Sequence, residues 1–195
     1  MRAGLKLGLA KRDIMPVFCT SGKKDMGTKR LMEFIINVAP GPIKAPAFKT
    51  VDGTEIMADE NGSAVMFVFK SSVEQHVGEI SYFRVVRGKL TEGMEVINSR
   101  TGNKEKIAQL FAVAGKNRVK VSEMFAGDIG CTVKLKGTKT NDTLCQPGKV
   151  IQITPILFPE PRSRAAVTAV TSSDDEKLGE LLNKLTAEDP AILVQ

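Results

Sequence analysis

Short apolar runs alternate with polar segments most regularly between residues 63 and 153 of the chain. The runs at residues 64–70 and 78–87 are rich in β-branched and aromatic residues, which predicts two strands. Further runs follow at intervals of about 8 to 12 residues, with Gly, Asn and Asp between them, as in antiparallel barrels and sandwiches. We therefore predict a mainly β protein built around an antiparallel β-barrel of about six to eight strands.

The later strands of this barrel follow from the same pattern. They are expected at residues 88–93, 94–98, 105–114, 131–136 and 149–153, with polar turns at residues 115–120 and 137–142. Residues 132–136 alternate as a half-buried strand does, so Val133 and Leu135 are expected to point inward and Lys134 and Lys136 into water. Closing such a sheet leaves no unpaired edge strand.

The residues before the barrel have the pattern of an α/β domain. The continuous apolar run at residues 14–19 is typical of a strand buried on both faces of a parallel sheet. Residues 28–38 predict an amphipathic helix with Leu31, Ile35 and Val38 on one face. No other run offers that strand a parallel partner. We therefore interpret residues 1–42 as the C-terminal remnant of an α/β domain, followed by a linker at residues 43–61 with a short extended piece near 47–51.

The residues after the barrel domain, which we place at 62–161, predict the opening of another α/β domain. Residues 163–170 and 191–194 are expected to be strands, and Ser173 and Glu176 to form a capping box at the start of the helix between them. The helix carries one apolar stripe, formed by Leu178, Leu181, Leu182 and Leu185. Residues 162–195 alone cannot bury this stripe, so we expect a truncated β-α-β segment whose apolar face allows non-physiological self-association.

The composition of the chain limits the kinds of binding partner and the cellular compartment that we expect. The formal net charge of +6 and the isoelectric point near 9.3 favour a polyanionic partner such as nucleic acid. No apolar run approaches the ~18 residues that span a membrane, and no signal peptide is visible, so we expect a cytoplasmic protein without a membrane partner. The three cysteines lie far apart and only one histidine is present, which argues against a metal site and against disulfides.

Taken in order, these segments resemble bacterial elongation factor G, a ribosomal translocase of the translational GTPase family. The resemblance covers the end of its GTP-binding G domain, in residues 1–42, all of domain II and the start of domain III. The matching motifs are PVFCTS at 16–21 with Gly27, FK at 69–70, VG at 77–78, FRV at 83–85, AGDIG at 126–130, DTL at 142–144, PEP at 159–161, DEKL at 175–178 and EDP at 188–190. Residues 73–76 and the pair Gly22-Lys23 depart from the family pattern, which leaves a changed nucleotide dependence open.

The resemblance implies that the longer protein binds GTP or GDP with Mg²⁺. It places the family's last guanine-binding loop at Thr20, Ser21 and Gly22. Hydrolysis needs a phosphate-binding loop of the form GxxxxGK[ST], a metal ligand and a residue that orients water. None of these motifs occurs in the sequence, so we expect no catalytic residue, metal or cofactor in this chain itself.

The resemblance also implies that the barrel docks on rRNA and protein of the small ribosomal subunit. Cations near strand ends are the candidates for phosphate contacts, although many of them are expected to be simply solvated. The first six are Lys70, Arg84, Arg87, Lys89, Arg100 and Lys104, and the further ones are Lys106, Lys116, Arg118 and Lys120. With no tryptophan and with Tyr82 as its only tyrosine, the chain favours backbone contacts with folded RNA over base stacking.

Two alternatives remain at this point. One is a fragment of a ribosomal protection or peptide-release GTPase, which uses the same barrel. The other is a stand-alone RNA- or protein-binding barrel with no relation to GTP. Coding sequence upstream of this segment separates the second alternative from the others, because only a GTPase requires a GxxxxGK[ST] loop there.

Overall fold

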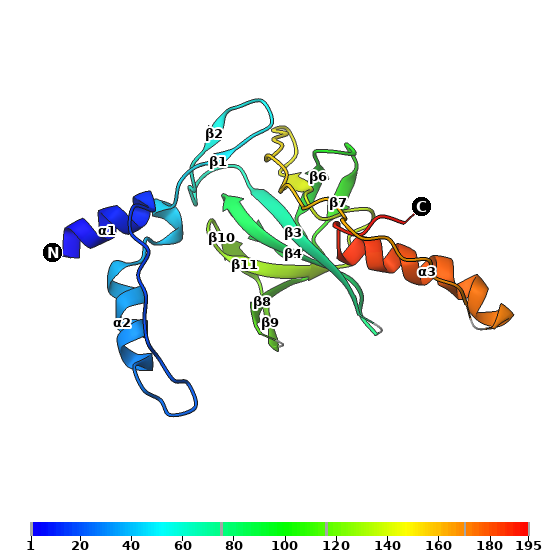
Figure 1. The fold of residues 1–195 in the computed structure, drawn as a ribbon. Helices are drawn as coiled ribbons and strands as arrows, with labels where there is room; N and C mark the ends of the chain where they lie inside the picture. Colours follow the sequence, from blue (N-terminus) through cyan, green and yellow to red (C-terminus); the bar gives the residue numbers. More distant parts are fainter. Residues whose placement is uncertain (1, 75, 116, 170, 195) are drawn as a thin grey trace. The chain divides into compact units, whose positions relative to one another are not determined.

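Two long strands form the centre of the fold, β3 (Val65–Glu74) and β4 (Gly78–Arg87), as the apolar runs predict (Figure 1). The structure is a computed structural model that describes residues 2–74, 76–115, 117–169 and 171–194. It divides into two units, Met1–Pro46 and Ala47–Gln195. The other strands are β1 (Phe48–Lys49), β2 (Glu55–Ile56), β5 (Lys89–Thr91), β6 (Glu95–Asn98), β7 (Lys104–Lys106), β8 (Leu110–Ala114), β9 (Asn117–Val121), β10 (Glu123–Phe125), β11 (Ile129–Val133) and β12 (Thr143–Cys145).

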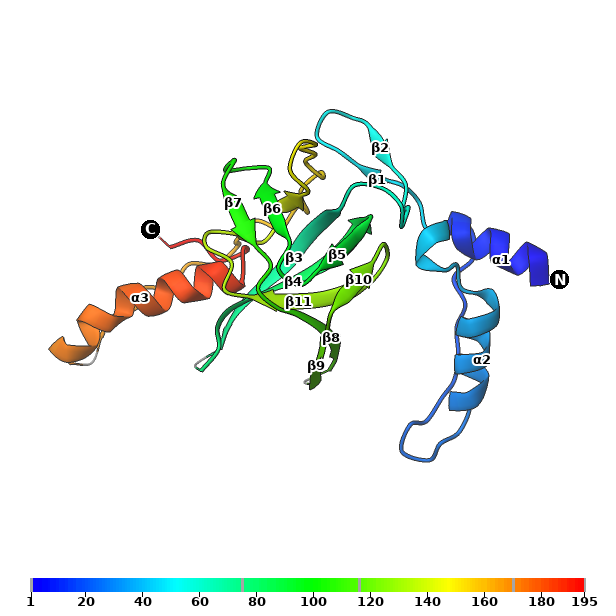
Figure 2. The ribbon, with the colours of Figure 1, turned by 180° about the vertical axis from the view of Figure 1, so that it is seen from behind.

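Eight of these strands form one antiparallel sheet in the order β7-β6-β12-β3-β4-β11-β8-β9 (Figure 2). The separate antiparallel pair β5–β10 lies between the two ends of this order. The Glu92 amide donates to the Ser122 carbonyl just after β9, and the Gly93 amide donates to the Ile107 carbonyl just after β7. These bonds bring the edges of the sheet together in a barrel-like form, which confirms the predicted mainly β fold.

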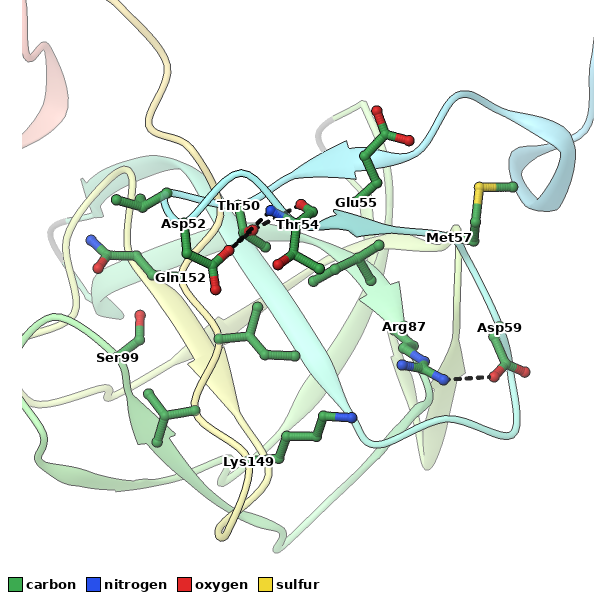
Figure 3. A pocket seen from close by; sticks show the side chains of 14 residues that line it. Thr50, Asp52, Thr54, Glu55, Met57, Asp59, Arg87, Ser99, Lys149 and Gln152 are labelled. Atoms are coloured by element: carbon green, nitrogen blue, oxygen red, sulfur yellow. Dashed lines mark hydrogen bonds and ion pairs between the residues drawn. The ribbon is translucent and has the colours of Figure 1, made fainter.

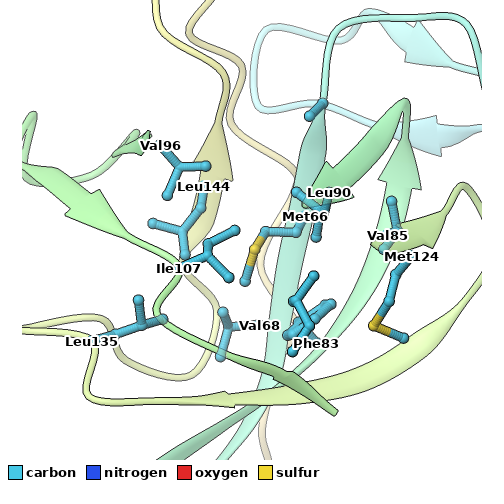
Figure 4. Packing of buried hydrophobic residues seen from close by; sticks show 12 residues of the cluster. Met66, Val68, Phe83, Val85, Leu90, Val96, Ile107, Met124, Leu135 and Leu144 are labelled. Carbon is cyan, nitrogen blue, oxygen red and sulfur yellow. The ribbon is translucent and has the colours of Figure 1, made fainter. Parts of the chain in front are cut away.

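The barrel interior is apolar and closely packed. Side chains from both halves of the sheet meet there, including Met66, Phe83, Leu90 and Leu144, each with no exposed surface (Figure 4). As predicted, Val133 and Leu135 are buried whereas Lys134 and Lys136 are exposed. The alternating strand itself was wrong, because β11 ends at Val133 and Lys134 has φ of 64°. Val133 packs with Ile80 and Cys131, whereas Leu135 belongs to the cluster inside the barrel. The exposed face of the sheet is therefore the place where charged side chains reach solvent.

Two further predictions of barrel strands were wrong. Residues 115–120 were expected to be a polar turn, but β9 pairs with β8 from Leu110↔Val121 to Ala114↔Asn117. Its charged residues hide the strand pattern because β9 is an edge strand, where charge is common. Residues 149–153 form no strand, and only Ile153 makes an isolated bridge, to Thr50. The strand in this region is β12, three consecutive buried residues at 143–145, too short to give an alternating pattern.

The first unit holds two helices, α1 (Arg2–Lys11) and α2 (Thr28–Val38), and a short 3₁₀ turn η1 (Pro42–Lys44). Helix α2 has the predicted bounds, and Gly27 precedes it with φ of 76°. The strand predicted at residues 14–19 is absent: these residues form no helix or strand, and Met15 and Val17 are 89% and 88% exposed. The physical reason is the one visible in the sequence, since the described part of this unit contains no parallel strand to pair with it.

After β12, the described residues before α3 (Ser172–Glu188) form no helix or strand apart from the bridge at Ile153. The strands predicted at 163–170 and 191–194 do not form in the described residues, because no neighbouring strand offers them hydrogen bonds; Val170 itself lies outside the description. Thr171 is the N-cap, and the side chains of the predicted box, Ser173 and Glu176, lie outside the described residues. Glu188 of α3 accepts a 2.6 Å hydrogen bond from the amide of Val73 at the end of β3.

Candidate nucleic-acid interface

The cations at the end of β4 and the start of β5 are paired with carboxylates. Arg87 Nη2 donates to Asp59 Oδ2 at 3.1 Å, and Lys89 Nζ donates to Glu123 Oε2 at 2.7 Å. Hydrogen bonds from the Asn61 amide and from Arg87 hold the pKa of Asp59 below its usual value, so this carboxylate stays ionised at neutral pH. Arg87 and Lys89 flank the turn between β4 and β5, and their charge is partly neutralised before any partner binds.

Two further predicted cations lie over aromatic rings. The Lys70 ammonium is 5.7 Å from the centre of the Tyr82 ring, and the Arg84 guanidinium is 5.2 Å from that of Phe48. Arg84 is half-buried, whereas Lys70 is exposed at the surface of the barrel. A cation that lies on an aromatic ring can still be contacted from the side away from the ring. Lys70 is exposed and therefore stays available for a phosphate contact, whereas Arg84 is half-buried and largely covered.

Arg100 serves the barrel itself. Its Nε and Nη2 donate to Asp142 Oδ1 and Oδ2 at 2.6 and 2.9 Å, and Asn98 Nδ2 and the Lys139 amide donate to Oδ2 at 2.8 Å each. Burial alone would raise the pKa of Asp142, but the hydrogen bonds from Arg100, Lys139 and Asn98 outweigh it and lower that pKa. A bidentate pair of this kind fixes the guanidinium, so Arg100 fastens the turn before β12 more than it offers charge to a partner.

Lys104 lies in a groove that the sequence reasoning did not identify. The groove has a volume of about 600 Å³ and is lined by the lysine side chains of β7 and of the segment after β11, namely Lys104, Lys106, Lys134 and Lys136. We call it the lysine groove. All four side chains belong to exposed residues, and none forms an ion pair within the described part of the chain. Lys134 and Lys136 were predicted to lie in water but were not counted among the docking residues.

The other predicted cations are separate from this groove or outside the description. Arg118 on β9 pairs with Glu74 at 2.5 Å, and Lys120 pairs with Glu92 at 2.8 Å. Lys116 lies outside the described residues. The sequence signal that could have found the groove is the repeated pattern of a lysine on each side of a buried residue, at 104–106 and again at 134–136.

The predicted guanine-binding loop is a tight turn in the first unit. The Ser21 amide donates to the Met26 carbonyl at 2.9 Å, and the Met26 amide donates back to the Ser21 carbonyl at 3.0 Å. Thr20 and Gly22 are exposed and Ser21 is half-buried. Because the Ser21 amide is already bonded, at most the amides of Thr20 and Gly22 remain to meet a base, and the assignment of this loop stays a prediction.

A larger cavity of about 880 Å³ opens beside the β1–β2 hairpin (Figure 3). Its charged lining includes three acidic residues, Asp52, Glu55 and Asp59, and two basic ones, Arg87 and Lys149. Asp52 is tied to Thr50 by a side-chain hydrogen bond, and its pKa is lowered by that bond. With acids in excess and Arg87 engaged by Asp59, this cavity is unsuited to a polyanion.

Comparison with known proteins shows which family this barrel is similar to. A family model described as elongation factor G domain 2 matches residues 63–147. Residues 63–147 are therefore similar to domain 2 of elongation factor G. A crystal structure of a protein from Thermus thermophilus is also similar, with 25% sequence identity and a TM-score of 0.79 over all of this chain. The match covers 27% of that protein, so the chain spans about a quarter of its length.

The elongation factor G-type resemblance drawn from the sequence is thereby confirmed, as is the β-barrel fold class. Cys131 and Cys145 of this barrel are buried, and burial raises the pKa of both thiols, as for small core residues. No helix in the described residues is long and apolar enough to cross a membrane.

Proposed function

We propose that this chain supplies ribosome docking and interdomain coupling to a ribosomal translocase of the elongation factor G type. The observation that supports this proposal is the similarity to elongation factor G domain 2 in a chain with a net charge of +6. The partner of the barrel is the rRNA and protein of the small ribosomal subunit. The translocase as a whole couples GTP binding and hydrolysis to the movement of transfer and messenger RNA, in the cytoplasm.

The nucleotide belongs to other parts of such a translocase. The printed sequence contains no GxxxxGK[ST] loop, and one of the three amides of the predicted guanine loop is bonded within the turn. The residues present therefore do not fit GTP with Mg²⁺ on their own. Within the proposal, the first unit contributes only the edge of a guanine site, and no catalytic step is assigned to this chain.

Docking is tested by an equilibrium titration of the chain with purified small ribosomal subunits at several salt concentrations. We expect saturable binding whose affinity falls steeply with salt, with a slope of about −3 in a plot of log K against log salt if about four phosphates are neutralised. Purified large subunits serve as the control for non-specific attraction to rRNA. An absence of association at low salt, or equal binding to both subunits, would overturn docking by this barrel.

A further inference from the structure

We propose that the lysine groove binds the phosphodiester backbone of folded RNA and is the principal docking contact of the barrel. This inference rests on the proposed function and names the surface that performs it. It moves the contact away from Arg84, Arg87 and Lys89, whose neighbours already engage them, to four lysines on β7 and the segment after β11.

The groove is built on a buried carboxylate. Glu105 lies between Lys104 and Lys106 on β7 and is 7% exposed. Its Oε2 accepts a 2.7 Å hydrogen bond from the Lys136 amide, and its Oε1 accepts a 3.0 Å bond from Thr138 Oγ1. These bonds fasten the segment after β11 to β7. Two stretches that are distant in the sequence thus present their lysines to one groove.

The acidic residues of the groove form no ion pair with these four lysines in the described structure. Glu105 is buried and already accepts two hydrogen bonds, and Glu92 at the rim pairs with Lys120. Glu95 lies opposite Lys106 across the β6–β7 pair but forms no ion pair with it in the described structure. Four lysines therefore line the groove without an ion pair in the described structure, and an anionic partner would supply the opposite charge.

The residues that line the groove favour binding of phosphate groups over binding of nucleic-acid bases or of a protein partner. Apart from charged side chains, only Gly93 and Ala108 line the groove, so no aromatic ring is present for base stacking. Residues two apart on a strand are separated by about 6.6 Å. Lys104 and Lys106 therefore present two point charges from the same face of β7, which suits the repeated charges of a phosphodiester backbone.

The test compares three variants of the full 195-residue chain. The groove variant changes Lys104, Lys106, Lys134 and Lys136 to Gln. The control variant changes four exposed lysines elsewhere, Lys49, Lys149, Lys177 and Lys184, to Gln, so that net charge falls equally. The third variant carries Arg at the four groove positions and keeps the charge. Binding is measured by titration with small ribosomal subunits and with a fluorescent RNA hairpin, and urea unfolding verifies that each variant folds.

We expect the groove variant to bind both probes roughly 100-fold more weakly at low salt and to lose about 3 from the salt slope. The control variant should lose far less affinity, and the Arg variant should bind as the unchanged chain does.

Equal losses of affinity in the groove and control variants would overturn the proposed role of the groove, because net charge alone would then explain binding. A groove variant that binds small subunits normally would also overturn it while leaving the proposed docking intact. If the unchanged chain binds the hairpin but no small subunit, the proposed function fails and the RNA contact stands. Displacement of the hairpin by polyglutamate at equal charge concentration would show a general polyanion surface and overturn specificity for RNA.

Discussion

Replacing Gly88 with Ala is expected to lower the free energy of unfolding of the barrel by about 3 to 4 kcal/mol. Gly88 joins β4 to β5 with φ of +73°, where an L side chain is strained. A Cβ there would lie 2.5 Å from the Gly62 carbonyl oxygen and 2.7 and 2.8 Å from N and Cα of Ala64. All three atoms are backbone, so the contact cannot be relieved by rotating a side chain.

The matched control is Gly93→Ala, which separates strain from crowding. Gly93 has φ of +83°, but nothing lies within 4 Å of an added Cβ. Its substitution should therefore cost only the conformational term, about 1 kcal/mol. Urea unfolding followed by circular dichroism measures both variants. Equal losses in the two would mean that the chain around Gly62 and Ala64 yields easily and that close packing at Gly88 contributes nothing.

The second large effect is expected at Asp142. The change Asp142→Asn removes a carboxylate that accepts hydrogen bonds from Arg100, Asn98 and the Lys139 amide while being almost completely buried. Hydrogen bonds to a charged group of this kind contribute more than neutral ones, so we expect a loss of about 2 kcal/mol at neutral pH. The amide group of Asn also replaces one acceptor oxygen with an NH2 donor, which would then face the N–H groups of Arg100, Asn98 or Lys139.

The same residue gives the barrel a pH dependence with a definite sign. The folded pKa of Asp142 lies below its ordinary value of 3.8, so its contribution to stability is complete above that value and is lost as the pH falls through the folded pKa. The free energy of unfolding should therefore drop as the pH is lowered from about 5 to below 3.8, and Asp142→Asn should drop less over the same interval. Asp13→Asn, at an exposed position in the first unit, is the control and should keep the slope of the unchanged chain. Parallel pH profiles for Asp142→Asn and the unchanged chain would contradict this account.

The pattern of apolar residues predicted the structure correctly where a segment's own sequence determines its secondary structure. The strand at residues 78–87 and the helix at residues 28–38 have the bounds that their apolar periodicity predicts, and Val133 and Leu135 are buried. Strands that depend on neighbours were missed. The charged edge strand β9 and the three-residue strand β12 carry little periodicity of their own, and the apolar run at 14–19 forms no strand without a partner.

The candidate site was less accessible to sequence reasoning for the same reason. Whether a cation is available depends on what lies beside it, and the partners of Arg87, Lys89 and Arg100 come from distant parts of the chain. Lys134 and Lys136 meet Lys104 only because Glu105 bonds to the Lys136 amide. Counting basic residues near strand ends therefore gives candidates for a docking surface but cannot tell which of them are free of carboxylate partners.

The bridge between Thr50 and Ile153 joins the chain where it enters the barrel to the chain where it leaves. The Val51 amide donates to the Gln152 carbonyl, and the Thr154 amide donates to the Lys49 carbonyl, each at 2.9 Å. A force that pulls the two flanking segments apart would break these few hydrogen bonds one after another before it acted on the sheet. Because the barrel begins and ends at nearly the same place, it can be inserted, lost or exchanged with little change in the distance between the segments that flank it.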